Sequence, residues 1–93
     1  MKTTITDLNP IGLNQKSFYG RAKIIRDENG FHLQSYDTIV CSVSNDNKFL
    51  RHWGNWSATT AKHINSFRCT LGHEKINKSA WLDMAVTPFI SVK

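Results

Sequence analysis

The most reactive side chains in this sequence are two cysteines and four histidines. A zinc site usually presents its ligands in pairs about two to five residues apart, but Cys41 and Cys69 lie far apart in the chain. The histidines also lack the i, i+4 spacing that places two ligands on one helix face. We therefore expect no metal site, and no metal or other cofactor.

A thiol nucleophile would need a base within hydrogen-bond reach. Cys69 and His63 fall in one predicted helix, but their six-residue spacing corresponds to about 240° around the axis, so the side chains point apart. Cys69 could meet His32 or His52 only through tertiary folding. The acidic residues mostly fall in predicted turns or stand alone, so no carboxylate pair is indicated. We therefore expect a protein that is not an enzyme.

The segment W-G-N-W-S-A-T-T-A-K-H-I, residues 53–64, concentrates aromatic, hydroxyl and basic side chains. It could be a chemical site, or it could be the place where a strand gives way to a helix. Gly54 and Asn55 break the preceding pattern, and Ser57 or Thr59 can accept hydrogen bonds from the first amides of a helix. We favour the junction, because helix capping requires these residue types at this position.

Several strands are expected before this junction. Residues 19–26 alternate small or apolar side chains with basic ones, which is typical of a half-exposed strand. Residues 27–30 end in Asn-Gly, a strong hairpin signal, and further strands are predicted over residues 31–33, 35–43 and 48–53. The opening residues 1–17 show no clear period and are predicted to form an irregular arm.

The main helix is predicted from the junction to about residue 71. Its apolar stripe consists of Ala61, Ile64, Phe67, Arg68 and Leu71, and Gly72 stands where a left-handed cap belongs. Residues 79–84 can form a second short helix, and a proline follows at position 88. This order predicts an α+β fold, with a small antiparallel sheet of about four strands packed against one main helix.

The composition indicates one folded domain spanning residues 1–93, since 40% of the residues are hydrophobic. The first ten residues contain no apolar run of the kind found in a secretory signal. No stretch approaches the roughly 18–20 apolar residues that cross a bilayer. We therefore expect a cytoplasmic protein without membrane contact, in which both cysteines are reduced.

The charge balance is the strongest indication of a partner. Twelve Lys and Arg against seven Asp and Glu give a net charge of +5, which attracts polyanions. Basic side chains interleaved with aromatic ones can hold a phosphate backbone and stack bases. The alternative is that the tryptophans belong to the core and the charges form an ordinary solvated surface. The candidate binding residues are Arg21, Lys23, Arg51, His52, Trp53, Trp56, Lys62, His63 and Arg68.

Two motifs in the second half of the chain are familiar. The pattern S-Y-x-T-x-V at residues 35–40 is followed by W-S-x-T-T-x-x-H-I-x-x-F at residues 56–67, and W-x-x-M-x-V follows at residues 81–86. This arrangement resembles a group of small uncharacterised proteins encoded by bacteriophages and other mobile elements. The resemblance covers residues 35–86 and implies a phage or mobile-element setting and a non-enzymatic accessory role, with no known activity attached.

Three functions remain open at this point. The domain could bind nucleic acid or a nucleoprotein through its basic face, with steep salt dependence. It could instead inhibit a host defence complex, for example as an anti-CRISPR protein. A structural role in the virion or its assembly is the third, and the sequence leaves the oligomeric state open.

Overall fold

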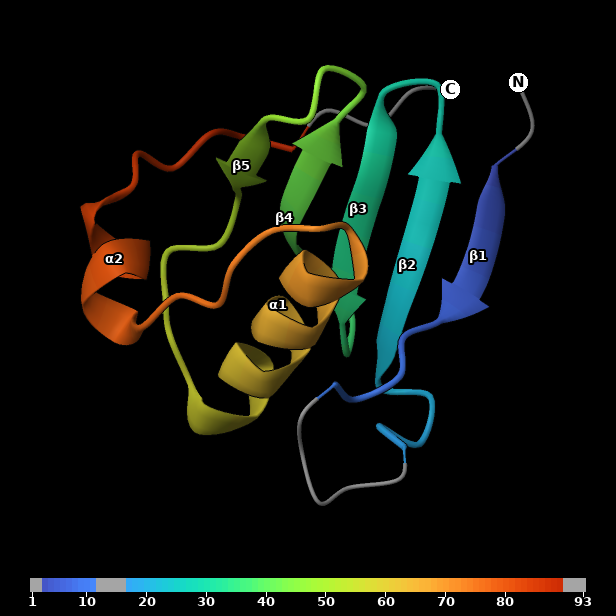
Figure 1. Cartoon of the computed structure of the whole chain (residues 1–93), viewed down its shortest axis with the longest axis horizontal. Helices are drawn as coiled ribbons and strands as arrows, with labels where there is room; N and C mark the ends of the chain where they lie inside the picture. Colours follow the sequence, from blue (N-terminus) through green and yellow to red (C-terminus); the bar gives the residue numbers. More distant parts are fainter. Residues whose placement is uncertain (1–2, 12–16, 90–93) are drawn as a thin grey trace.

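The computed structural model describes residues 3–11 and 17–89. Within them, a five-stranded antiparallel sheet has the strand order β1-β2-β3-β4-β5, so each strand pairs with its neighbour in sequence (Figure 1). A longer and a shorter helix follow the sheet. The elements are β1 (Thr4–Asp7), β2 (Ala22–Asp27), β3 (Gly30–Ser35), β4 (Thr38–Ser44), β5 (Phe49–Arg51), α1 (Ala58–Thr70) and α2 (Lys78–Asp83).

The predicted α+β class is confirmed, but the sheet has five strands where about four were expected. The additional strand is β1, at the outer edge, and all four of its residues are exposed. Its position comes from pairing with β2, in which Thr6 faces Ile24, and not from a local pattern. The prediction of an irregular arm is therefore wrong for β1, while residues 12–16 of that arm lie outside the described residues.

The predicted hairpin turn joins β2 to β3. Asp27 and Gly30 form the closing pair of the two strands, and the amide of Asn29 donates to Oδ1 of Asp27 over 2.8 Å. Gly30 has a φ of +132°, a conformation that side chains rarely adopt. The Asn-Gly signal thus marks this turn correctly, and Asp27 gains a fixed position at the end of β2.

Both predicted ends of α1 are confirmed. The side chain of Ser57 accepts a hydrogen bond from the amide of Thr60 over 3.1 Å, as an N-cap does. At the other end Gly72 has a φ of +83°, and the amides of Gly72 and His73 donate to the carbonyls of Cys69 and Arg68. This pair of bonds is the Schellman arrangement, which satisfies the last helical carbonyls.

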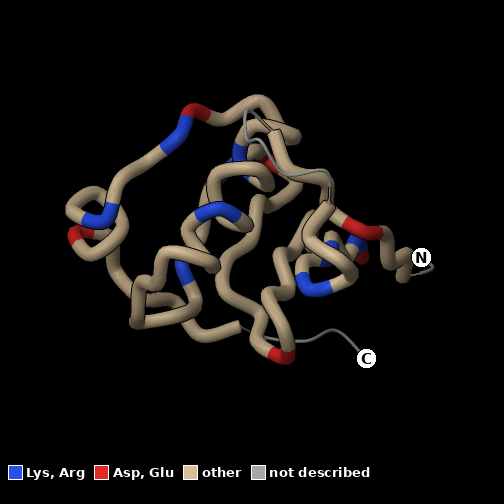
Figure 2. Tube along the Cα trace, turned by 90° about the horizontal axis from the view of Figure 1, so that it is seen from below, with Lys and Arg blue, Asp and Glu red and all other residues tan. Residues whose placement is uncertain are grey.

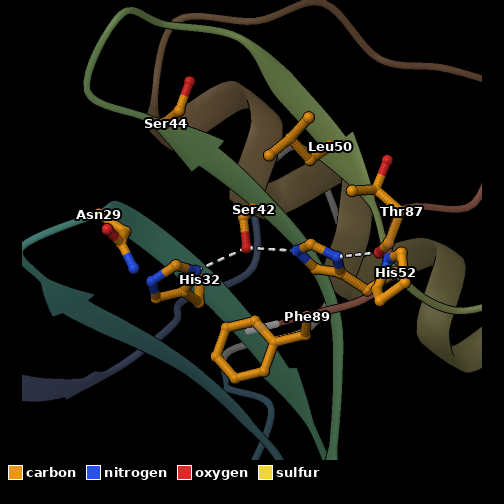
Figure 3. A pocket seen from close by; sticks show the side chains of 9 residues that line it. Asn29, His32, Ser42, Ser44, Leu50, His52, Thr87 and Phe89 are labelled. Carbon is orange, nitrogen blue, oxygen red and sulfur yellow. Dashed lines mark hydrogen bonds between the residues drawn. The ribbon is translucent and has the colours of Figure 1, made fainter. Parts of the chain in front are cut away.

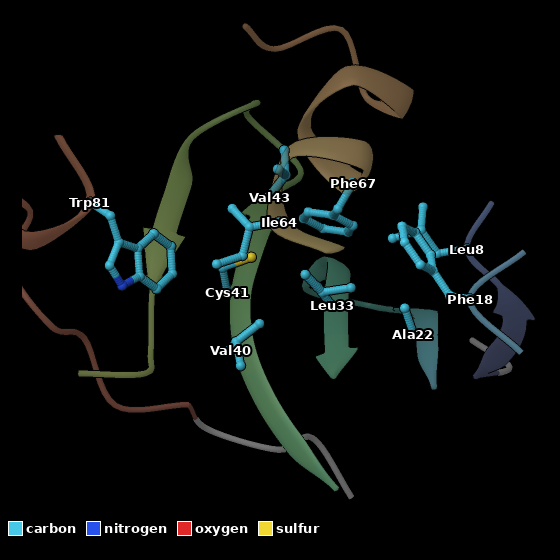
Figure 4. Packing of buried hydrophobic residues seen from close by; sticks show 10 residues of the cluster. All are labelled: Leu8, Phe18, Ala22, Leu33, Val40, Cys41, Val43, Ile64, Phe67 and Trp81. Carbon is cyan, nitrogen blue, oxygen red and sulfur yellow. The ribbon is translucent and has the colours of Figure 1, made fainter. Parts of the chain in front are cut away.

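The core lies between one face of the sheet and the helices (Figure 4). It is apolar because alternate strand residues share a face and meet the inner stripe of α1. Trp81 of α2 closes one end of the cluster, and its side chain is fully buried. The buried hydrophobic residues are Leu8, Phe18, Ala22, Leu33, Val40, Cys41, Val43, Ile64, Phe67 and Trp81.

The sheet register defines a second row of side chains that alternate with the core residues. His32 faces Ile25 on one side and Ser42 on the other, and Ser42 in turn faces Leu50. The chain beyond α2 returns to this part of the sheet: Val86 forms a parallel bridge with Arg51, and the amide of Thr87 donates to the Arg51 carbonyl over 2.7 Å. Neither helix in the described residues is long and apolar enough to cross a membrane.

Candidate functional site

Three of the candidate binding residues are buried, which corrects the expectation that they lie on an exposed basic face. Arg51 is 5% exposed, His63 is 2% exposed and Arg68 is 8% exposed. Burial removes a side chain from the reach of a large polyanion, so these residues have structural roles.

Arg51 holds the strand-to-helix junction to the C-terminal part of the chain. Its Nε donates to the Trp53 carbonyl over 2.9 Å, its Nη2 to the Gly54 carbonyl over 2.7 Å and its Nη1 to the Met84 carbonyl over 2.7 Å. The guanidinium also lies 5.3 Å from the centre of the Trp81 ring. A planar fork of five N–H donors suits this task, because it reaches several carbonyls at once.

Arg68 plays a similar part at the end of α1. Its Nε donates to the Glu74 carbonyl over 2.6 Å, and its guanidinium stacks 4.4 Å from the centre of the Phe49 ring. Burial lowers the pKa of Arg68. The position of Arg68 on the predicted apolar face of the helix therefore indicated its burial correctly, whereas its charge suggested exposure.

The tryptophans support the alternative interpretation, in which they belong to the core. Trp53 and Trp56 are partly buried and pack against the hydrophobic cluster. The ring of Trp56 lies 6.0 Å from that of Trp81, whose Nε1 donates to the Asn55 carbonyl over 2.7 Å. The segment from 53 to 64 is thus a strand-to-helix junction in this structure, as favoured above.

The charges of the described residues do not form a broad basic surface. Of the twelve Lys and Arg, Lys2, Lys16 and Lys93 lie outside the described residues, while Arg51 and Arg68 are buried. The seven described cations that remain are matched by seven Asp and Glu in the chain. Figure 2 shows the two signs scattered along the trace. The remaining cations are Arg21, Lys23, Arg26, Lys48, Lys62, Lys75 and Lys78.

The two longer motifs that carry the resemblance meet in the folded chain. The hydroxyl of Ser35 lies 2.7 Å from Nδ1 of His63 and 3.3 Å from the hydroxyl of Thr60. The ring of Phe18 packs edge-on against His63 at 4.5 Å, and the ring of Tyr36 lies 5.9 Å from it. Desolvation by burial, with the nearby charge of Lys62, lowers the pKa of His63. The motif residues thus connect α1 to the turn between β3 and β4 through buried hydrogen bonds and ring contacts.

Next to these contacts lies an exposed group that we call the tyrosine surface: Tyr19, Arg21 and Tyr36. Tyr19 is 75% exposed and Tyr36 is 48% exposed, and the Arg21 guanidinium lies 6.0 Å from the centre of the Tyr36 ring. The amide of Tyr36 donates to the Arg21 carbonyl over 2.7 Å, which fixes the two turns together. Of the predicted binding residues, only Arg21 belongs to this surface, and both tyrosines were missed.

Both tyrosines adopt a backbone conformation that side chains disfavour. Each has a φ of 55°, in the left-handed region. This conformation costs about 1–2 kcal/mol for a residue with a Cβ. A bulky residue there is uncommon enough to suggest a purpose other than stability.

A chain of hydrogen bonds crosses the other row of the sheet, and we call it the histidine array: Asp27, His32, Ser42, His52 and the Thr87 carbonyl. Nε2 of His32 lies 2.8 Å from Oδ1 of Asp27, and Nδ1 of His32 lies 2.6 Å from the Ser42 hydroxyl. That hydroxyl lies 2.7 Å from Nε2 of His52, whose Nδ1 lies 2.5 Å from the Thr87 carbonyl (Figure 3).

All members of the histidine array except Asp27 line a pocket of about 310 Å³. Apolar side chains of Leu50, Pro88 and Phe89 complete its lining. The Phe89 ring lies edge-on to both imidazoles, 5.1 Å from His32 and 5.4 Å from His52. His52 was among the predicted binding residues, whereas His32, Ser42 and Asp27 were not. Their convergence depends on strand register, which no local pattern in the sequence provides.

Asp27, His32 and Ser42 stand in the order of a hydrolytic triad, but the surroundings suit another role. Ser42 is only 3% exposed. Acyl transfer also needs amide donors for the oxyanion, and the backbone of Ser42 is used within the sheet, because β4 lies between β3 and β5. The described residues around Ser42 therefore show a chain of hydrogen bonds but no oxyanion site.

The metal-ligand types do not gather elsewhere in the described residues: no three His, Cys, Asp or Glu lie so that they could hold a metal ion. Both cysteines are free thiols, Cys41 in the core and Cys69 partly exposed. Desolvation by burial raises the pKa of Cys41, so its thiol remains protonated.

Comparison with known proteins places the chain without assigning an activity. No curated protein matches it, and no solved structure matches it either. A model of a family of unknown function, DUF8033, matches residues 6–84. That range includes both helices, the tyrosine surface and most of the histidine array. The chain therefore belongs to the DUF8033 family.

Proposed function

We propose that this domain is a small, non-enzymatic accessory protein of a phage or other mobile element that binds single-stranded nucleic acid, free or within a nucleoprotein, in the host cytoplasm. The observation that carries the proposal is the tyrosine surface, where two exposed aromatic rings occupy neighbouring turns and one of them, Tyr36, lies beside the Arg21 guanidinium. Every base has a face that can stack on such a ring, and each stack contributes about 1–3 kcal/mol. The setting in a mobile element rests on the sequence resemblance alone.

The backbone supports a role for these rings outside the core. Tyr19 and Gly20 both have positive φ, and the Arg21 amide donates to the Phe18 carbonyl over 3.0 Å, so a tight turn displays Tyr19. Tyr36 sits at the matching turn between β3 and β4. The chain bears the conformational cost of two left-handed tyrosines and still leaves much of each ring in solvent. A stacking platform explains this placement.

The charge distribution argues for a single strand and against a duplex. A duplex presents a dense double row of phosphates, and proteins that bind it usually offer many cations. Here the seven described cations that are not buried are equalled by seven acidic residues, and Arg21 is the one cation within the tyrosine surface. Base stacking predicts weak sequence preference. Because few phosphates would be neutralised, we expect a shallower dependence on salt than the steep one expected from the sequence.

Replacing both tyrosines tests the proposal. Asparagine tolerates the left-handed conformation, so Tyr19→Asn with Tyr36→Asn removes the rings while sparing the backbone. We expect the affinity for a labelled single-stranded oligonucleotide, measured by fluorescence anisotropy, to fall by about 10- to 100-fold, as the loss of one or two stacks requires.

The matched control is Leu82→Asn, which makes the same kind of change at a residue of α2 that is 46% exposed. It should bind like the unaltered protein. Arg21→Gln should weaken binding and flatten the salt dependence by about one phosphate contact. Absence of binding to both DNA and RNA at about 50 mM salt, or equal affinity in the tyrosine double variant, would refute the proposal.

A second candidate is an inhibitor that binds a host defence complex, such as a CRISPR complex. The observation that favours it is the balance of charges, since mixed charges with exposed aromatic residues are typical of protein interfaces. In that case a stoichiometric complex with one host protein should survive nuclease treatment. It should be lost with the tyrosine double variant and kept with Leu82→Asn.

A further inference from the structure

The histidine array has an acceptor at each end, and this determines how many protons it needs. The Thr87 carbonyl can only accept, so Nδ1 of His52 carries a proton. The carboxylate of Asp27 also accepts, so Nε2 of His32 carries one as well. Between these ends, the Ser42 hydroxyl has an imidazole nitrogen on each side.

Four hydrogen bonds link these groups, and each requires one proton. Two neutral imidazoles and one hydroxyl supply three protons between them. The complete array with an ionised Asp27 therefore holds one proton more than its neutral side chains contain. Three of the four ring nitrogens of His32 and His52 are then protonated, whichever way the Ser42 hydroxyl points.

The surroundings favour placing that proton next to Asp27. Burial by itself would raise the pKa of Asp27, but hydrogen bonds from His32 and from the Asn29 amide outweigh it, and the pKa is lowered. Desolvation lowers the pKa of His52, against the bond to Thr87, and the nearby His32 lowers it further. These two directions favour a carboxylate at Asp27 and a neutral ring at His52, so within the four-bond array the additional proton lies between Asp27 and Ser42, and the Ser42 hydroxyl donates to His52.

We propose that the histidine array is a proton-binding site that fastens the segment from Thr87 to Phe89 onto the sheet. This inference is independent of the nucleic-acid proposal, since none of its residues belongs to the tyrosine surface. Among residues 3–11 and 17–89, the ionisable groups that face the array are Asp27, His32 and His52. Its other lining groups are neutral: Asn29, Ser42 and Ser44 from the turn and β4, Leu50 from β5, and Thr87, Pro88 and Phe89 from the segment itself.

Removing the proton breaks one bond of the array. Nδ1 of His32 would then face the Ser42 oxygen at 2.6 Å with no hydrogen between them, and the two lone pairs repel. The Phe89 ring packs against both imidazoles, so movement of the His32 ring disturbs the packing of Phe89. The attachment should therefore weaken as the pH rises and the proton leaves.

A second proton also disturbs the array, because the Ser42 oxygen would then accept from both rings, its own hydroxyl proton would lose its acceptor, and two positively charged rings would face each other across it. The lowered pKa of His52 means that the folded chain binds fewer protons here than the unfolded chain does. Stability is then lost as the pH falls below the ordinary imidazole value of about 6.5. The segment is thus fastened within a pH window with an acid and an alkaline limit.

Nitrogen-15 NMR of the full chain measures the proton count directly. At about pH 7 we expect three of the four ring nitrogens of His32 and His52 to be protonated. As the pH is raised toward about 9, the count should fall to two, with loss of the contacts between the Phe89 ring and the His32 ring. Two protonated nitrogens at pH 7 would mean two neutral rings and would overturn the proposal.

Two variants complete the test. In Asp27→Asn, the side-chain oxygen can still accept from the Asn29 amide and from Nε2 of His32, but the negative charge that balances the additional proton is lost. We therefore expect two protonated ring nitrogens already at pH 7, and loss of the Phe89 contacts at a lower pH than in the unaltered chain. His73→Gln is the control, because His73 lies outside the array and bonds to Asn47. It should behave like the unaltered chain, and an unchanged alkaline limit in Asp27→Asn would contradict the proposal.

Discussion

Replacing Arg51 with methionine is expected to lower the free energy of unfolding by at least about 3 kcal/mol. The change breaks three partly buried hydrogen bonds and leaves the carbonyls of Trp53, Gly54 and Met84 without the donor that now satisfies them. It also removes the cation from the Trp81 ring. Urea denaturation followed by tryptophan fluorescence measures the loss, since Trp81 and Trp56 adjoin the site.

Two companion variants separate the cause. Lys62→Met makes a similar change at an exposed cation of α1 and should alter the free energy of unfolding by less than about 0.5 kcal/mol. Arg51→Lys keeps the charge but loses the planar fork, so most of the destabilisation should remain. If Arg51→Met were as mild as Lys62→Met, the hydrogen bonds of Arg51 would not stabilise the junction.

Replacing Gly30 with alanine is the second change with a large expected effect. A Cβ at this position would lie 2.3 Å from the Val43 carbonyl oxygen and 3.0 Å from the Cα of Ser44. Both neighbours are backbone atoms of β4, so strands must separate to admit the methyl group. With the added strain of a φ of +132°, we expect a loss of at least about 3 kcal/mol in thermal or urea unfolding.

Two other glycines provide matched controls for strain and for contact. Gly72 has a φ of +83° but nothing within 4 Å of its Cβ position, so Gly72→Ala should cost only about 1–2 kcal/mol. Gly54 has open space and no positive φ, so Gly54→Ala should be nearly neutral. An equal loss at positions 30 and 72 would show that contact with β4 contributes nothing.

The parts of the fold that could be predicted are those with local causes. The turn before Gly30, the cap at Ser57 and the left-handed Gly72 each depend on a few neighbouring residues, and all three are confirmed. The strand β1 has no such local cause, because its exposed residues are ordered by pairing with β2. A prediction from the alternation of apolar and polar residues cannot detect a strand of that kind.

The binding residues were harder to predict, because burial depends on what covers a helix. His63 was expected to be a binding residue on the basic face, yet it is buried, as is Ser66 in the same helix. The chain before β2 covers this side of α1: Phe18 packs on His63, and the Ile11 amide donates to the Ser66 hydroxyl over 3.1 Å. A charge or an imidazole indicates exposure only when no distant segment folds over it.

The tyrosine surface and the histidine array illustrate two different limits. Tyr36 occurs in a motif noted from the sequence, and an aromatic residue beside a turn could have been proposed as exposed. The array depends on the exact pairing of His32 with Ser42 and on the return of Thr87 from the far end of the chain. A shift of one residue in register would turn each side chain to the other face.

The succession of strands, each beside the next one in the chain, has a consequence for how quickly the protein folds. Every hairpin of the sheet closes a loop between sequence neighbours, and the entropy lost in closing a loop rises with its length. Chains dominated by such near-neighbour contacts cross their folding barrier rapidly. The packing of Phe89 against His32 joins residues far apart in the chain, so we expect it to form late in folding.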